Sequence, residues 1–150
     1  TYQIASEGGT APTNNLSKRI GIRKDLHQLS HTAAKDEDGF KDWGLWDQFV
    51  ARQFAYFINR LRETPEGDGR LLDRCLIFQG AATSKVHDNT NYPIIMAGGR
   101  QMGHKTGQFV TYDEEKNNLA NLFVRIANSM DVPMEKFGDS TGIPMSELFA

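Results

Sequence analysis

The sequence predicts an α/β fold in which helices flank a mainly parallel sheet. Two short apolar runs, residues 75–79 and 92–97, are bounded by Gly and Pro, which is typical of strands buried on both faces of such a sheet. Two longer segments, residues 42–63 and 114–130, repeat apolar residues every three or four positions, as amphipathic helices do. We expect these helices to pack on the sheet.

The length, composition and charge of the chain indicate how many domains it forms and which partners are not expected. A chain of 150 residues with 39% hydrophobic and 24% charged residues has an ordinary globular composition. It is expected to form a single domain or the carboxyl-terminal part of a larger α/β domain. The formal net charge of −2 does not favour a nucleic-acid partner. No apolar segment approaches the roughly 20 residues that span a bilayer, so no membrane span is expected.

The first 31 residues contain one candidate metal-binding motif. Residues 1–23 show no periodicity and predict an extended arm or a loop. In D-L-H-Q-L-S-H, residues 25–31, His27 and His31 are four positions apart and would share one face of a helix. Such a pair can bind a metal, although zinc needs a third ligand from elsewhere. Ser30 lies between them, either as a nucleophile or as the cap of a local turn.

The longest predicted helix spans residues 42–63. Its apolar side chains form one stripe, which must face a core or a partner because burying each side chain contributes roughly 1.5–3 kcal/mol. Turn-forming residues 64–69 end the helix, and a strand is expected to begin near Asp73 or Arg74. The stripe comprises Trp46, Phe49, Val50, Phe54, Phe57, Ile58 and Leu61.

The central stretch, Cys75–Gly99, contains the clearest candidate for a site. Its two apolar runs flank a loop, residues 80–91, of small and polar residues with His87 near its centre. Ligands in open α/β sheets bind beyond the carboxyl ends of strands, and a long connection without secondary structure is usually either functional or disordered. We therefore expect His87 to lie at the rim of a site.

A glycine-rich segment, residues 98–107, follows the second apolar run. It is not a P-loop, because His104 stands where a lysine should follow the spaced glycine and residues 108–112 alternate like a strand. His104 and Lys105 are candidates to contact a substrate from this turn. The alternative is a simple exposed turn.

The remaining residues predict a packing helix and a loop. Asp113 is the expected N-cap of helix 114–130, and the tail is expected to form a loop with one final turn from Ser146. Only two convincing strands and one weaker strand are present, whereas a buried parallel strand needs neighbours on both sides. We therefore expect the rest of a larger chain, a second subunit or a homo-oligomer to complete the sheet.

Six motifs occur together in one order along the chain. They are L-H-Q-L-S-H-T, F-A-Y-F-I-N-R-L-R-E-T-P-E-G-D-G-R-L-L-D, H-D-N-T-N-Y-P-I-I-M-A-G-G, K-T-G-Q-F-V, N-N-L-A-N-L-F and F-G-D-S-T-G. Their order resembles the carboxyl-terminal portion of the HXXSHH-domain proteins, over residues 21–142. Those proteins are bacterial, often exported, of unknown function, and distantly related to the alkaline phosphatase and sulfatase superfamily. The resemblance implies part of an alkaline-phosphatase-like α/β/α sandwich and an exported or periplasmic location.

The motif that names the family is incomplete in this chain. His27, Ser30 and His31 match it, whereas Thr32 stands in place of its last histidine. Leu26 stands where many relatives carry a further histidine. Half of the local histidine cluster is therefore absent.

The resemblance also suggests roles for the central loop. The superfamily commonly places a histidine metal ligand after a strand, and His87 occupies such a position here, although Val86-His87-Asp88 replaces the usual Asp-His pair. His27, His31 and His87 are then the implied metal ligands. Asp88, together with Lys105 and His104, is a candidate to contact the substrate.

Two functions are compatible with these residues. The first is a metal-dependent hydrolase of phosphate or sulfate esters, in which zinc, manganese, magnesium or calcium neutralises developing charge and activates water or a hydroxyl. The second is a non-catalytic binding or assembly subunit with a degenerate site, which the missing histidines and the incomplete sheet favour. Resemblance in fold does not decide between them.

Overall fold

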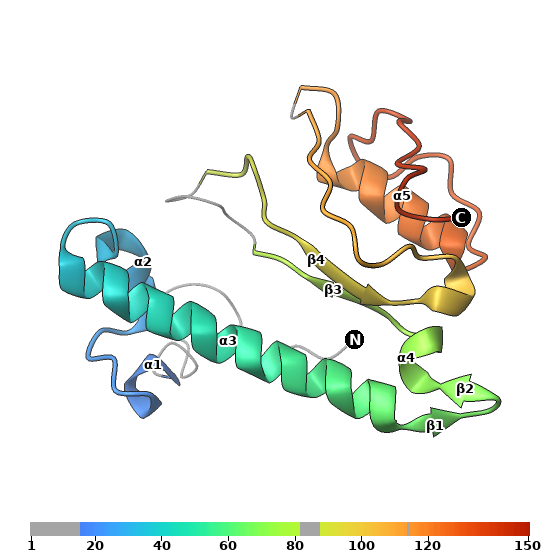
Figure 1. The fold of residues 1–150 in the computed structure, drawn as a ribbon. Helices are drawn as coiled ribbons and strands as arrows, with labels where there is room; N and C mark the ends of the chain where they lie inside the picture. Colours follow the sequence, from blue (N-terminus) through green and yellow to red (C-terminus); the bar gives the residue numbers. More distant parts are fainter. Residues whose placement is uncertain (1–15, 82–87, 114) are drawn as a thin grey trace. The chain divides into compact units, whose positions relative to one another are not determined.

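The computed structural model describes residues 16–81, 88–113 and 115–150. The chain divides into two compact units, Thr1–Tyr56 and Phe57–Ala150, which are considered separately below (Figure 1). Within the described residues, no helix is both long and apolar enough to cross a membrane.

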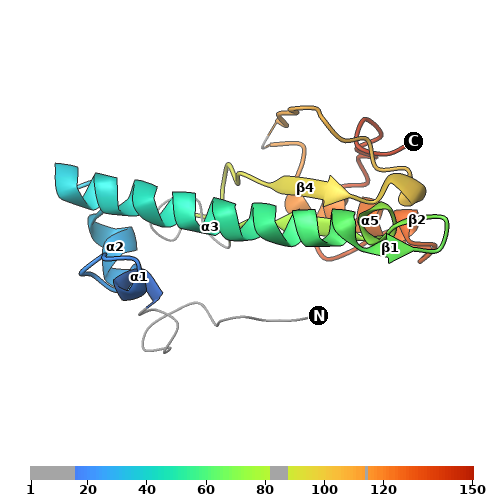
Figure 2. The same cartoon turned by 60° about the horizontal axis from the view of Figure 1, so that its bottom comes forward.

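The first unit is helical. It contains α1 (Leu16–Arg19), α2 (Leu26–Thr32) and the greater part of α3 (Glu37–Glu63) (Figure 2). Its small core is built from the fully buried side chains of Ile22 and Leu29. The first helical turn lies within the stretch predicted as an extended arm, of which residues 1–15 are outside the described part of the chain.

Side-chain caps set the ends of α2 and α3. The Asp25 carboxylate accepts a hydrogen bond from the Gln28 backbone N–H at 2.9 Å and so begins α2. The Asp36 carboxylate likewise accepts a hydrogen bond from the Gly39 backbone N–H at 2.5 Å. Helix α3 therefore begins at Glu37, five residues before the predicted start at residue 42. Gly39 is required there, because a Cβ would lie 2.8 Å from the Thr32 carbonyl oxygen.

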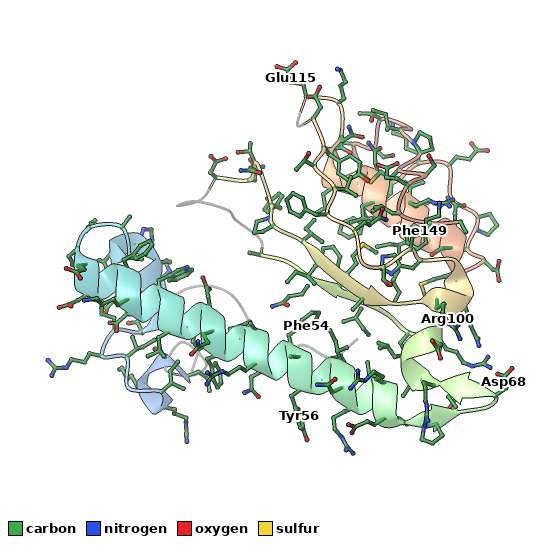
Figure 3. The ribbon with its side chains drawn as sticks, in the orientation of Figure 1. Phe54, Tyr56, Asp68, Arg100, Glu115 and Phe149 are labelled. Atoms are coloured by element: carbon green, nitrogen blue, oxygen red, sulfur yellow. The ribbon has the colours of Figure 1, made fainter. Side chains whose placement is uncertain are left out.

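Helix α3 has the predicted apolar stripe but buries none of it. The one buried residue among its 27 is Gly39. Figure 3 shows Phe54, which belongs to the stripe, and Tyr56 on opposite sides of the helix. Six of its seven side chains are half-buried and Phe57 is exposed, so the stripe is only partly packed within the described residues.

The second unit begins with a short hairpin and a capped helical turn. Strands β1 (Pro65–Glu66) and β2 (Gly69–Arg70) pair antiparallel, and α4 (Leu71–Arg74) follows directly. The Asp73 carboxylate accepts from the Arg70 backbone N–H at 3.0 Å and thereby caps α4. Figure 3 shows Asp68 at the hairpin, where it pairs with Arg74 at 2.8 Å.

The central strands form an antiparallel hairpin. β3 (Leu76–Gln79) pairs with β4 (Ile95–Gly98), so that Leu76 lies opposite Gly98 and Phe78 opposite Met96. The predicted mainly parallel sheet, and with it the α/β/α sandwich of the alkaline-phosphatase type, is wrong for this chain. The described residues contain only two sheets, each with two antiparallel strands.

The physical reason lies in the connection between these strands. Apolar composition identifies strands that are suited to burial but carries no information on their direction. A parallel neighbour requires a crossover, usually through a helix. The described parts of the connection, residues 80–81 and 88–94, contain no helix, and the chain returns alongside β3 in the opposite direction.

Helix α5 (Leu119–Ser129) packs on the hairpin, as Figure 1 shows. Phe123 on α5 and Phe78 on β3 have ring centroids 5.9 Å apart. The buried core of this unit consists of Ala120, Leu122, Met145 and Phe149.

Two local predictions in this region are corrected. The N-cap of α5 is Asn118 rather than Asp113, because Asp113 instead closes a separate turn by accepting from the Glu115 backbone N–H at 3.0 Å. Residues 108–112 form no strand, and Phe109 within them is 93% exposed. An alternating segment needs a neighbouring strand, which the described residues do not supply there. The final turn at Ser146 is present.

Candidate functional site

The histidine pair lies on α2 as its spacing predicts. The rings of His27 and His31 meet edge to face, with centroids 4.8 Å apart. Leu29, on the other side of the helix, is fully buried and fixes α2 in its unit. The structure therefore presents two imidazoles side by side on one helix face.

Ser30 is engaged with the backbone of the same helix. Its hydroxyl donates to the His27 carbonyl oxygen at 2.7 Å, a bond that serine often makes inside a helix. This geometry fits the local capping role better than the nucleophilic role.

A complete metal site is not formed by the part of the chain that the structure describes. Across residues 16–81, 88–113 and 115–150, no three His, Cys, Asp or Glu side chains are grouped as ligands of one ion. The third predicted ligand, His87, lies outside these ranges, so its position relative to α2 is not described. His27 and His31 thus supply two of the three or four ligands that a zinc ion needs.

An open groove of about 550 Å³ lies in the first unit, near the start of α3. Its lining carries both signs of charge, and Lys24 approaches Asp36 at 4.0 Å. Asp36 already caps α3. The groove is lined by Arg23, Lys24, Asp36, Asp38, Lys41 and Asp42. Such a mixed, solvated lining favours no single class of ligand.

His104 is held inside the second unit rather than displayed from an exposed turn. Only 7% of its surface is exposed, and its Nδ1 lies 2.8 Å from the Gly98 carbonyl oxygen. Because a carbonyl oxygen only accepts, Nδ1 carries the proton that forms this hydrogen bond. Phe149 packs on the imidazole, with centroids 5.3 Å apart.

The chain near its carboxyl end holds this histidine in place. Residues 104 and 149 form an antiparallel bridge, and the Ala150 N–H donates to the Gly103 carbonyl oxygen at 2.7 Å. Arg125 on α5 covers the outer face of Phe149 at 5.2 Å. Nothing in the sequence near His104 signals this arrangement, because Phe149 is distant in the chain.

The other two predicted substrate contacts lie on the surface. The Lys105 ammonium donates to the Ser146 carbonyl oxygen at 3.4 Å. Asp88 accepts from the backbone N–H and the hydroxyl of Thr90, at 3.2 and 3.0 Å, in a local turn. Each of these side chains therefore has a structural partner within its own region.

Two motifs that the sequence presents separately meet in one polar network. Asn121, from N-N-L-A-N-L-F, is 2% exposed and makes two hydrogen bonds of 2.8 Å with Thr141, from F-G-D-S-T-G. Asn118 donates to the Asp139 carbonyl oxygen at 2.5 Å. These bonds fix the glycine-containing loop, residues 137–142, against α5. Asparagines at helical spacing near a Gly-rich loop were the available signal for this contact.

A shallow groove of about 150 Å³ adjoins this network. Its lining is mainly apolar, with Arg125 and Glu135 as opposite charges. The lining residues are Asn121, Val124, Arg125, Asn128, Glu135, Gly142, Ile143 and Pro144. Neither histidine of α2 nor any predicted substrate contact lines it.

Comparison with known proteins identifies no relative. No protein-family model matches the sequence, and no curated protein and no solved structure matches it significantly.

Proposed function

We propose that this chain is part of an exported bacterial protein of the HXXSHH type, and that it serves as an assembly module. Its apolar surfaces are covered by another polypeptide, which is the rest of a larger chain, a second subunit or another copy. The main observation that supports this proposal is the number of large apolar side chains exposed in the described residues.

Exposed apolar side chains outnumber buried ones. In the described part of the chain, six hydrophobic residues are buried, whereas eleven large ones are exposed. Exposed apolar side chains of this size favour an interaction role, because each one removed from water contributes roughly 1.5–3 kcal/mol. The exposed residues are Phe40, Leu45, Tyr56, Phe57, Phe78, Ile95, Phe109, Phe123, Met130, Val132 and Phe137.

The β3–β4 hairpin supports the same proposal. Phe78 on one face and Ile95 on the other are both exposed, although strands that are apolar on both faces usually lie inside a sheet. Each strand also has one edge without a pairing strand in the described residues. Open apolar edges are templates for strand addition.

Light scattering combined with binding of a hydrophobic dye tests this proposal on the full chain. We expect the dissociated chain to bind 1-anilinonaphthalene-8-sulfonate strongly, and binding to fall when the chain associates. A monomer that binds no dye and unfolds in one cooperative transition would contradict the assembly function.

A second candidate function is a metal-dependent hydrolase of phosphate or sulfate esters. The observation that favours it is the pair His27 and His31, whose rings are 4.8 Å apart on one face of α2. Together with a further ligand such as His87, they would hold a divalent ion, which would neutralise charge on a transferring oxyanion.

Metal titration of single variants tests this second candidate. His27→Ala and His31→Ala should each weaken zinc binding at least about tenfold, a loss of about 1.4 kcal/mol. Gln28→Ala, on the same helix, is the control and should leave the affinity unchanged. If the natural protein binds no zinc, manganese, magnesium or calcium and hydrolyses neither p-nitrophenyl phosphate nor p-nitrophenyl sulfate, the candidate fails.

A further inference from the structure

Residues 108–112 form an extended segment, and we propose that it pairs with the same segment of a second copy of the chain as two antiparallel strands. This inference rests on the proposed assembly function and names the partner. The segment lies wholly within the second unit, Phe57–Ala150. Phe109 within it is 93% exposed, more than any other large hydrophobic residue that the structure describes.

The segment already has the backbone of a strand. Residues 108–113 form no helix, turn or bend. Phe109 and Thr111 are exposed, whereas Val110 and Tyr112 are half-buried. This alternation is typical of a strand that packs one face on its own unit. Phenylalanine, valine, threonine and tyrosine are also residue types that are enriched in strands.

Both ends of the segment are held in place. The Gln108 side chain donates to the carbonyl oxygens of Lys105 and Glu147, at 3.1 and 2.9 Å. At the other end, the Asn117 backbone N–H donates to the Asp113 carbonyl oxygen at 2.9 Å and closes a turn. A strand that is ordered before it binds loses less conformational entropy when it pairs.

The backbone of the segment has no partner of its own. No N–H or C=O group of residues 108–112 forms a hydrogen bond with another backbone group in residues 16–81, 88–113 and 115–150. Such peptide groups are open to pairing with an added strand. Exposed strands usually avoid this pairing through a charged residue or a proline, and the segment contains neither.

The segment is complementary to itself in one register. A twofold axis at Val110 pairs all five residues of one copy with the five of the other and places Phe109 opposite Thr111. This pair forms twice on the exposed face, and an aromatic side chain opposite a β-branched one stabilises antiparallel strands. An axis at Phe109 or at Thr111 would instead bring Gly107 or Asp113 into the ladder.

The charges that flank the segment favour the antiparallel direction. Lys105 precedes the segment and Asp113 follows it directly, so antiparallel pairing brings the acidic end of each copy to the basic end of the other. The present contacts do not prevent this approach. Lys105 donates one long hydrogen bond, at 3.4 Å, to the Ser146 carbonyl oxygen, and the exposed ion pair of Asp113 with Lys116 contributes little. Because the two ends of one segment complement each other, they favour another copy over an unrelated protein.

Hydrogen exchange of the full chain tests the pairing. It is measured by NMR on dilute and concentrated samples, whose association is followed by sedimentation equilibrium. Successive N–H groups of a strand point to opposite edges, so pairing along one edge protects alternate amides. On association, either residues 109 and 111 or residues 108, 110 and 112 should gain at least about tenfold protection.

Two charge variants test the register and the direction. Phe109→Glu removes the aromatic member of both cross-strand pairs and should raise the dimer dissociation constant at least about tenfold. Phe40→Glu, the same change at a side chain that is 73% exposed in the first unit, should have no effect. Lys105→Glu places like charges at both ends of the paired strands and should raise the constant at least about threefold. Its control is Lys136→Glu, at an exposed lysine of the same unit.

The outcomes separate this inference from the assembly function. A dimer with alternate protection that is weakened by Phe109→Glu and by Lys105→Glu supports the inference. A dimer in which residues 108–112 are all protected or all unprotected, or that either variant leaves unchanged, overturns it. A monomer that binds the hydrophobic dye also overturns it, but leaves the assembly function standing with a different partner. A monomer that binds no dye and unfolds in one cooperative transition overturns both proposals.

Discussion

Gly98 is the residue with the most restricted surroundings. It has φ of +73° at the end of β4, and the Gly99 N–H beside it donates to the Leu72 carbonyl oxygen at 3.0 Å. A Cβ on Gly98 would collide with the carbonyl oxygens of Cys75 and Leu72. The backbone of β4 can approach α4 this closely only because the residue is glycine.

Gly98→Ala should therefore lower the thermal midpoint far more than Gly107→Ala. Gly107 has nearly the same φ, +79°, but no atom within 4 Å of an added Cβ. Gly107→Ala, the control, should lower the free energy of unfolding by about 1–2 kcal/mol, because alanine disfavours the left-handed conformation. Overpacking in Gly98→Ala should lower it by about 1–3 kcal/mol more. Circular dichroism melting measures both. Equal midpoints for the two variants would show that Gly98 is not closely packed.

Tyr112 and Glu147 form a pair whose strength depends on pH. Burial, and then the neighbouring Glu147 carboxylate, raise the pKa of Tyr112, whose hydroxyl has no hydrogen-bond partner among the described residues. The Tyr112 hydroxyl is the main cause that lowers the pKa of Glu147. A lowered carboxyl pKa contributes stability above the unfolded value of about 4.5, and this stability is lost as the pH falls through the folded pKa.

Tyr112→Phe should accordingly destabilise the chain at pH 7 but not well below pH 4. The effect at pH 7 is expected to be at most about 0.5 kcal/mol, because the Glu147 carboxylate is almost fully exposed. Urea unfolding at both pH values measures it, with Glu147→Gln as the background in which the pH dependence should vanish. An equal loss at pH 3 and pH 7 would exclude this pair as the cause.

At the scale of elements, the contact between α5 and the 137–142 loop depends on one buried amide. The side chain of Asn121 accepts a hydrogen bond from the Thr141 backbone N–H and donates one to the Thr141 hydroxyl. The loop contains glycines with positive φ at both 138 and 142, so it has little conformational preference of its own. The amide therefore determines where the loop lies on α5.

Asn121→Ala should release this loop. Leaving the Thr141 backbone N–H without its acceptor should lower the free energy of unfolding by about 1–3 kcal/mol. The Thr141 backbone N–H should also lose protection from hydrogen exchange. Asn89→Ala, at an exposed asparagine, is the control. Unchanged exchange at Thr141 in the Asn121 variant would mean that other contacts hold the loop.

Local elements were predictable because their signals are local. Apolar periodicity located α3 and α5, and apolar runs located the two central strands. The spacing of His27 and His31 predicted that they would share a face if their segment were helical. The direction of β4 was not predictable, since it depends on how the connection returns. The burial of His104 was not predicted either, because the residue that packs on it, Phe149, is distant in the sequence. Tertiary partners that are distant in sequence decided both cases.

At the scale of the whole molecule, the predicted fold class is wrong, whereas the predicted need for another polypeptide stays a prediction. The stripe of α3 and the composition of β3 and β4 require apolar neighbours. Within the described residues Phe57, Phe78 and Ile95 are exposed, whereas the other side chains of the stripe are half-buried. The parallel sheet was inferred from that same composition and is wrong. The need for neighbours follows from the hydrophobic effect, whereas strand direction does not.

The chain contains two compact units. Trp43 and Trp46, its two tryptophans, both lie in the first unit, so their fluorescence reports on that unit. Far-ultraviolet circular dichroism reports on the helices of both units. Comparing these two signals during unfolding therefore shows whether the units share one cooperative core.

Urea unfolding of the dissociated chain, followed by both signals, tests most directly whether the chain needs another polypeptide. A chain whose apolar faces lack a partner should show shallow transitions that differ between tryptophan fluorescence and circular dichroism, and association should make them steeper and bring them together. A monomer with one steep transition, identical by both signals, would contradict the assembly function.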